Sequence, residues 1–201
     1  MPHLVPLLIR GINNLSDARY CAGMGADKIT FVLDPTLPGH LDAKTVKELA
    51  GWIAGVELIG EFDRLSAAEV NAIAAECGLD AVLLRSSRTA AELAEIAPPV
   101  YLELGADYMN QPQPFPASVT GIVLEIAGLS PNDAPETRAA WRKLAIQGAL
   151  WLGPGLHPAL AHQLATELPL AGLVFPSGNE VKPGLRDFDQ LEAVFEALEM
   201  D

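Results

Sequence analysis

Charged residues stand at or close to the ends of several apolar stretches of this chain. Arg10 and Arg85 are the cations of this set, and Glu61, Glu103 and Glu125 are its carboxylates. An arginine can hold an anionic group through two parallel hydrogen bonds, and a glutamate can serve as an acid, a base or a hydrogen-bond acceptor. If these side chains meet, they form either a polar ligand site or a salt-bridge network that fills a disused pocket, since isolated buried charges are too costly to persist.

Glycine-rich segments follow the last two apolar stretches. The first segment holds Gly153 and Gly155, and the second holds Ser177 and Gly178. Glycine lets the backbone approach an anion closely, and backbone N–H groups together with a serine hydroxyl are typical phosphate ligands. We therefore predict a site for a phosphorylated small molecule here, weakened because Pro154 supplies no N–H.

His40 is a further candidate contact for a ligand, because it lies in the second loop that follows a predicted strand. An exposed loop histidine is the simpler interpretation of the same residue. No histidine–carboxylate group has the spacing of a metal site. We expect neither a metal nor a cofactor.

Short apolar stretches alternate with helical patterns along the chain. Eight stretches are predicted as buried strands: Leu4–Ile12, Lys28–Leu33, Val56–Phe62, Asp80–Arg85, Val100–Leu104, Gly121–Ile126, Ala149–Leu152 and Ala171–Phe175. Seven helices are predicted between and after them: Ser16–Gly25, Asp42–Trp52, Ser66–Cys77, Thr89–Ala97, Glu136–Gln147, Pro158–Leu168 and Phe188–Met200. Ser16 is the expected N-cap of the first helix, and Ser66 with Glu69 has the spacing of a capping box.

Eight such units predict a (β/α)8 barrel that forms a single domain over residues 1–201. Gly105–Val119 contains prolines and no apolar period, so we expect a loop there in place of the fifth helix. An open, doubly wound parallel sheet is the alternative that the same alternation allows. In a barrel, the charged and glycine-rich strand ends would all lie at the carboxyl end of the strands, where active sites of this fold are built.

Composition narrows the classes of function. The 201 residues carry a net charge of −13 and are 50% hydrophobic, which excludes the basic surface that nucleic acid or an anionic membrane would require. No apolar stretch is long enough for a membrane span, and no secretory leader is visible. Cys21 and Cys77 read as reduced thiols, so we expect a cytoplasmic protein, either a monomer or a homodimer.

Motifs at both ends of the chain resemble one known family. The chain opens with Leu7-Leu8-Ile9-Arg10-Gly11-Ile12 and then Asp17-Ala18. It closes with Ser177-Gly178, Glu180, Pro183-Gly184 and Asp187. In order and spacing, these segments resemble the phosphoribosylanthranilate isomerase family of tryptophan biosynthesis, and the resemblance covers nearly the whole chain. It implies a (β/α)8 barrel with a phosphate site after the seventh and eighth strands.

The resemblance also shows where this chain departs from the family. Arg10 stands where the family has its general-base cysteine, and a guanidinium cannot take a proton. Glu125 matches the aspartate that serves as general acid, and Arg85 stands where a histidine usually ends the fourth strand. The arginine that recognises the carboxylate of the substrate has no counterpart in Leu37-Pro38-Gly39.

Two functions are therefore open. The first is a barrel of this family that binds a phosphorylated small molecule and has lost most or all of the ordinary isomerase activity. The second is an active sugar-phosphate isomerase, acting on phosphoribosylanthranilate or a related substrate, with Glu125 as its general acid.

Overall fold

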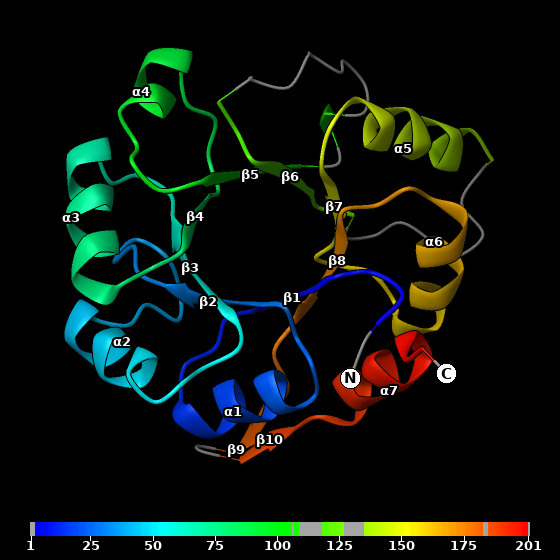
Figure 1. Ribbon diagram of the computed structural model, residues 1–201, viewed down its shortest axis with the longest axis horizontal. Helices are drawn as coiled ribbons and strands as arrows, with labels where there is room; N and C mark the ends of the chain where they lie inside the picture. The colour runs from blue at the N-terminus through cyan, green and yellow to red at the C-terminus, as the bar shows by residue number, and fades with distance from the viewer. Residues whose placement is uncertain (1–2, 106, 109–117, 127–134, 183–184, 201) are drawn as a thin grey trace.

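The computed structural model describes residues 3–105, 107–108, 118–126, 135–182 and 185–200. Its eight parallel strands close into a barrel in chain order (Figure 1). The strands are β1 (Leu7–Arg10), β2 (Lys28–Val32), β3 (Glu57–Phe62), β4 (Ala81–Leu84), β5 (Val100–Leu104), β6 (Gly121–Leu124), β7 (Leu150–Leu152) and β8 (Gly172–Pro176). β8 pairs with β1 in parallel register from Leu7↔Leu173 to Arg10↔Pro176, so the barrel is confirmed and the open sheet is wrong.

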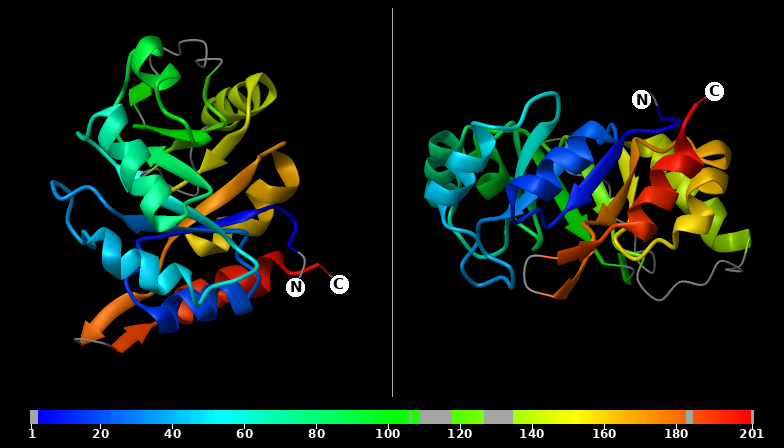
Figure 2. Two further views of the ribbon diagram at one scale, coloured as in Figure 1. Left: turned by 60° about the vertical axis from the view of Figure 1, so that its left-hand side comes forward. Right: turned by 90° about the horizontal axis from the view of Figure 1, so that it is seen from below.

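Helices form a ring around the strands (Figures 1 and 2). They are α1 (Leu15–Gly23), α2 (Ala43–Ala50), α3 (Ala67–Cys77), α4 (Ala90–Ala94), α5 (Pro135–Gln147), α6 (Ala161–Glu167) and α7 (Asp189–Leu198), with the short 3-10 helix η2 (Pro158–Leu160) before α6. The described residues between β5 and β6 contain no α-helix, while 106 and 109–117, where most of the predicted loop falls, lie outside them. In the part of the chain that the structure describes, no helix has the length and apolar character needed to cross a membrane.

Helix starts follow local capping chemistry. The capping box of α3 is confirmed, because the Ser66 side chain accepts the N–H of Glu69 and the Glu69 carboxylate accepts the N–H of Ser66. The expected N-cap of α1 is wrong. Asn14 is extended and its Oδ1 accepts the N–H of Asp17 at 2.9 Å, so Ser16 already lies inside the helix. Asparagine is as good a cap as serine, and here it is the residue that precedes the first helical turn.

Alternate residues of each strand fill the barrel interior. This inner cluster contains Leu8, Ile59, Ala81, Leu83, Tyr101, Val123, Trp151 and Val174. The intervening residues face the helices and form the larger core of the protein. Since side chains alternate along a strand, the residue two positions after an inner residue also points inward, toward the carboxyl end of the barrel.

The amino end of the barrel is closed by an aromatic floor. The rings of Tyr101 and Trp151 meet edge to face with centroids 5.9 Å apart, and the Lys28 ammonium lies 5.7 Å from each centroid while pairing with Glu57. A Cβ on Gly172 would lie 2.3 Å from the Trp151 ring, so the indole requires glycine on the neighbouring strand.

An antiparallel hairpin, β9 (Asn179–Lys182) and β10 (Leu185–Asp187), follows β8 outside the barrel (Figure 2). No pattern in the sequence predicted this hairpin. The hairpin occupies the segment between the predicted phosphate residues and α7, and so it fixes the geometry of that loop.

Candidate functional site

Four charged side chains meet at the barrel mouth, which is the carboxyl end of the strands. Arg10 ends β1, Glu61 and Glu103 are the last but one residues of β3 and β5, and Arg85 directly follows β4. Each lies two positions after an inner residue such as Leu8, so each side chain points inward above the apolar interior. We call these four residues the mouth network.

Arg10 and Glu61 form the centre of the mouth network. Arg10 donates from Nε to Glu61 Oε1 at 2.9 Å and from Nη2 to Glu61 Oε2 at 2.5 Å. This two-bond geometry is the strong form of an arginine–carboxylate pair. Arg10 is only 7% exposed and Glu61 is fully buried, so the pair is shielded from solvent. Thr30 adds a hydroxyl donor to Glu61 Oε1 at 2.5 Å.

Arg85 and Glu103 complete the network. Arg10 Nη1 donates to Glu103 Oε1, and Nη2 lies 3.3 Å from Glu103 Oε2. Arg85 donates from Nε and Nη2 to Glu61 Oε2 at 2.8 and 2.5 Å, and its Nε lies 3.8 Å from Glu103 Oε2. Two cations thus alternate with two carboxylates, and the network is electrically neutral.

The network fixes the protonation state of its members. Burial opposes ionisation of Glu61, but hydrogen bonds and charge from Arg10, the charge of Arg85 and the Thr30 hydroxyl together lower its pKa to about 2. Burial likewise opposes the charge of Arg10, yet Glu61 and Glu103 raise its pKa above the ordinary value. Neither group can therefore exchange a proton near pH 7, as a general acid or base must.

Glu125 stands apart from these four residues. It follows β6 directly and lies two positions after the inner residue Val123. Its side chain therefore points inward at the mouth, as those of the mouth network do. Its backbone N–H donates to Leu104 O at 2.8 Å. Its carboxylate makes no hydrogen bond or ion pair with any residue that the structure describes, and it is partly exposed. Of the predicted catalytic residues, Glu125 is the one whose side chain is not committed to the network.

Some N–H groups of the predicted phosphate loops already donate to backbone carbonyls of the barrel. The N–H of Gly153 donates to Leu124 O at 3.1 Å, and the N–H of Ser177 donates to Arg10 O at 2.8 Å. The Ser177 hydroxyl lies 3.2 Å from Gly11 O. Gly178 is pressed against the hairpin, where a Cβ would lie 2.5 Å from Asp187 O. These three predicted residues therefore shape the loops, and the N–H groups of Gly153 and Ser177 are directed into the barrel wall.

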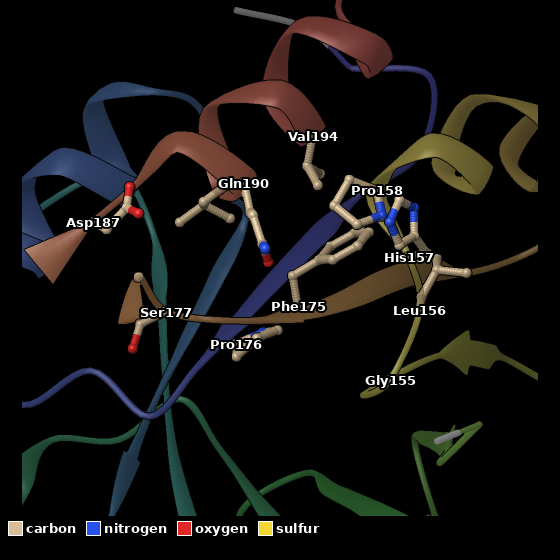
Figure 3. A pocket seen from close by; sticks show the side chains of 12 residues that line it. Gly155, Leu156, His157, Pro158, Phe175, Pro176, Ser177, Asp187, Gln190 and Val194 are labelled. Carbon is tan, nitrogen blue, oxygen red and sulfur yellow. The ribbon is translucent and has the colours of Figure 1, made fainter. Parts of the chain in front are cut away.

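Two backbone N–H groups that could bind an anion lie further along the loop after β7. Within the described residues, the N–H groups of Gly155 and Leu156 donate to no acceptor. Gly155 has a φ of +97°, a conformation that glycine adopts readily, and it is exposed. Both residues border a cavity of about 240 Å³ between β8, η2 and α7 (Figure 3). The predicted Gly155 thus stays available to an anion, and Leu156 is a donor that sequence reasoning missed.

His40 is not brought to the mouth network. It is exposed in the loop between β2 and α2, and it does not border the cavity beside Gly155. Within the described residues, no group of three or more His, Cys, Asp or Glu side chains is arranged as a metal site.

Two supporting residues carried no motif that the sequence analysis recognised. Thr30 joins β2 to the network, as described above. Asp34 is fully buried and its Oδ2 accepts the N–H groups of Asp63 and Arg64 at 2.8 and 2.7 Å, which anchors the loop after β3. Although burial opposes its ionisation, bonds from Thr36 and from this loop hold the pKa of Asp34 below its usual range. A polar residue directly after a buried strand was the available signal for Asp34.

Comparison with known proteins places these features in context. No family model matches the chain. It is 29% identical over 203 residues to N-(5'-phosphoribosyl)anthranilate isomerase of Paracoccus denitrificans, and over 194 residues to the protein of the same name from Acidithiobacillus ferrooxidans, with 94% of both chains covered in each case.

Among solved structures, phosphoribosyl anthranilate isomerase from Thermotoga maritima matches with a TM-score of 0.79 at 20% identity, over 96% of this chain and 98% of that one. A structure of such an isomerase in complex with reduced 1-(o-carboxyphenylamino)-1-deoxyribulose 5-phosphate matches with a TM-score of 0.78, also at 20% identity, over 96% of this chain and 97% of that one. At this identity the structural likeness shows the shared barrel fold.

Proposed function

Since this chain belongs to the phosphoribosylanthranilate isomerase family, we propose that it is a member whose ordinary isomerase activity is lost or much reduced, and whose barrel binds a phosphorylated small molecule. The observation that carries the proposal is the mouth network, in which Arg10 is bonded to both Glu61 and Glu103.

Loss of turnover follows from the chemistry of Arg10. The family resemblance assigns its position to the general base, and a permanently protonated guanidinium cannot accept a proton. The resemblance also implies an arginine that holds the carboxylate of the substrate, and this chain has Gly39 and its neighbours in that segment. A positioned acid or base typically contributes about 10²–10⁴-fold to a rate, so losing the base and the carboxylate contact together removes most of the catalysis.

Binding of a phosphorylated ligand is supported by the loop after β7. The N–H groups of Gly155 and Leu156 have no acceptor among the described residues, and they border a cavity. Backbone N–H groups at glycine-rich turns are common phosphate ligands. Asp187 also borders this cavity, so we expect the affinity for a phosphate dianion to be modest.

Glu125 favours a second candidate function. Its carboxylate lies at the mouth without a described partner, at the position that the resemblance assigns to the general acid. An isomerase that uses Glu125 as acid would need a base other than Arg10. Glu61 does not meet this need, because its pKa of about 2 makes it a very weak base.

The first test is growth of a tryptophan auxotroph that lacks phosphoribosylanthranilate isomerase and carries this chain. Purified protein is assayed for turnover in parallel, and an active relative serves as the positive control. We expect no growth, and no turnover above background from a protein that is folded by circular dichroism. Clear turnover would refute the proposed loss of activity. In that case Glu125→Gln decides the mechanism, since full activity in this variant would exclude Glu125 as the acid.

Binding is tested separately by titrating inorganic phosphate into the purified protein and following the 31P resonance. Saturable binding at millimolar concentrations supports the ligand part of the proposal. A protein that is folded and shows no saturation would refute that part, whatever the result of the growth assay.

A further inference from the structure

The cavity beside the phosphate loop leads away from the barrel axis. It lies between β8, η2 and α7, and its inner wall is formed by Leu156, Phe175, Leu191 and Val194 (Figure 3). All four of these side chains are buried. We call this space the outer cavity. It is a mainly apolar space on the helix side of the barrel wall.

The mouth network lies on the inner side of the barrel wall, at the ends of β1, β3, β4 and β5. The Arg10 side chain is bonded to Glu61 and Glu103, and the Arg10 carbonyl accepts the N–H of Ser177. A ligand held by the N–H groups of Gly155 and Leu156 therefore has room on the outer side, where these residues border the outer cavity.

Polar groups of the outer cavity are limited to its edges. The carboxamide of Gln190 points from α7 toward Phe175 and Pro176 (Figure 3). His157 Nδ1 accepts the N–H of Ala159 at 3.2 Å, so in the neutral ring the proton is on Nε2, which remains a donor. These donors suit the oxygens of an anion, the carboxylate of Asp187 opposes an anion, and Leu156, Phe175, Leu191 and Val194 offer apolar contact.

The volume limits the size of the apolar group. The outer cavity measures about 240 Å³, whereas an apolar cavity of about 150 Å³ is enough to bind benzene. One aromatic ring or a short alkyl chain therefore fits.

We infer that the ligand is a phosphate monoester of a small aromatic or aliphatic group, with its phosphate at the N–H groups of Gly155 and Leu156 and its apolar group in the outer cavity. This inference rests on the proposed function, because it requires that the loop after β7 binds phosphate. Beyond the proposed function, the inference specifies the chemical class of the ligand and the side of the barrel wall on which its apolar group lies.

The test compares three ligands by calorimetry or 31P titration: inorganic phosphate, glycerol 3-phosphate and phenyl phosphate. Burying a phenyl group should tighten binding of phenyl phosphate by about tenfold or more over the other two. Val194→Phe fills the outer cavity and should reduce phenyl phosphate to the affinity of glycerol 3-phosphate, while inorganic phosphate binds as before. Ala193→Phe is the matched control, because Ala193 is the exposed neighbour on the same helix and should change none of the three affinities.

The outcomes separate the two proposals. If inorganic phosphate binds and phenyl phosphate binds no more tightly, the outer cavity is not the ligand site and the proposed phosphate site stands. If none of the three binds, both proposals are wrong. Should Val194→Phe fail to fold, the methyl resonances of Val194 and Leu191 in the unmodified protein give the answer. They should shift on adding phenyl phosphate, and shifts confined to barrel residues such as Leu83 would overturn the inference.

Discussion

Replacing Arg10 with methionine tests how much the mouth network stabilises the barrel. The substitution keeps an unbranched apolar stem, removes the guanidinium, and leaves the fully buried Glu61 with Arg85 and Thr30 as its remaining partners. Glu103 would keep only the contact of 3.8 Å with Arg85. Removing one partner of a buried ion pair typically costs about 3–5 kcal/mol, because an uncompensated charge stays behind. We expect a loss of this size at pH 7, which is a large share of the stability of about 5–15 kcal/mol of a typical domain.

The pH dependence of this loss supplies an independent check. The folded pKa of Glu61 is about 2, below its ordinary value of 4.5. Its contribution to stability is therefore fully present above about pH 4.5 and disappears as the pH falls through 2, and the difference in pKa corresponds to about 3 kcal/mol. Arg10→Met removes one cause of the low pKa of Glu61, so the pKa of Glu61 in the folded variant should be higher. The variant should therefore lose less stability on acidification than the unmodified protein. The difference in free energy of unfolding between the unmodified protein and the variant should be smaller at pH 3 than at pH 7.

The assay is urea unfolding followed by tryptophan fluorescence at both pH values. Arg138→Met is the control, since Arg138 pairs at 3.0 Å with Glu167 on the surface, where such a pair contributes about 1 kcal/mol or less. If Arg10→Met costs no more than this control at pH 7, or if its deficit is unchanged at pH 3, the assignment of stability to the network is refuted.

Three other perturbations follow from described geometry. Gly153→Ala should lower the free energy of unfolding by about 3 kcal/mol, because φ is +113° and the new Cβ would lie 2.1 Å from Val174 O. Gly39→Ala is the control, because Gly39 has a φ of +79° but open space around it, and it should lower the free energy of unfolding by only about 1 kcal/mol. Equal losses for the two variants in urea unfolding would show that the contact with Val174 O does not matter. Asp34→Ala should cost about 3 kcal/mol, because it leaves N–H groups of the loop after β3 without an acceptor, and a melting temperature equal to that of the unmodified protein would refute this. Ser66→Ala should cost about 1 kcal/mol through loss of the capping box of α3, and an unchanged urea midpoint would show that the cap is dispensable.

Much of the fold could be predicted because local patterns and the closed topology agree. The alternation of buried stretches with helical patterns identified all eight barrel strands, and the Ser66–Glu69 spacing identified the start of α3. The start of α1 was missed because Asn14 and Ser16 are both good caps, and their local sequence does not say which one stays extended. The hairpin after β8 was missed because its two strands are only four and three residues long.

The sequence indicated which charged residues could meet, but it did not indicate which hydrogen bonds they form. Their positions at or near the ends of predicted strands made Arg10, Glu61, Arg85 and Glu103 candidates, and the structure shows their contacts. Which N–H groups of the phosphate loops remain free depends on strand register, and no local pattern carries that information. Ser177 is an example, since its N–H is taken by a carbonyl from the first strand, far away in sequence.

The neutrality of the mouth network has a kinetic consequence. Two guanidinium groups face two carboxylates within a few ångströms, so their fields cancel at a distance and the network does not draw an anion toward the protein. An approaching phosphate ester instead meets the field of a protein with a net charge of −13. Added salt shortens the range of that repulsion, to about 10 Å at 0.1 M. The association rate constant of a phosphorylated ligand should therefore rise with ionic strength, the reverse of the behaviour of a binding site that steers its anionic ligand by positive charge.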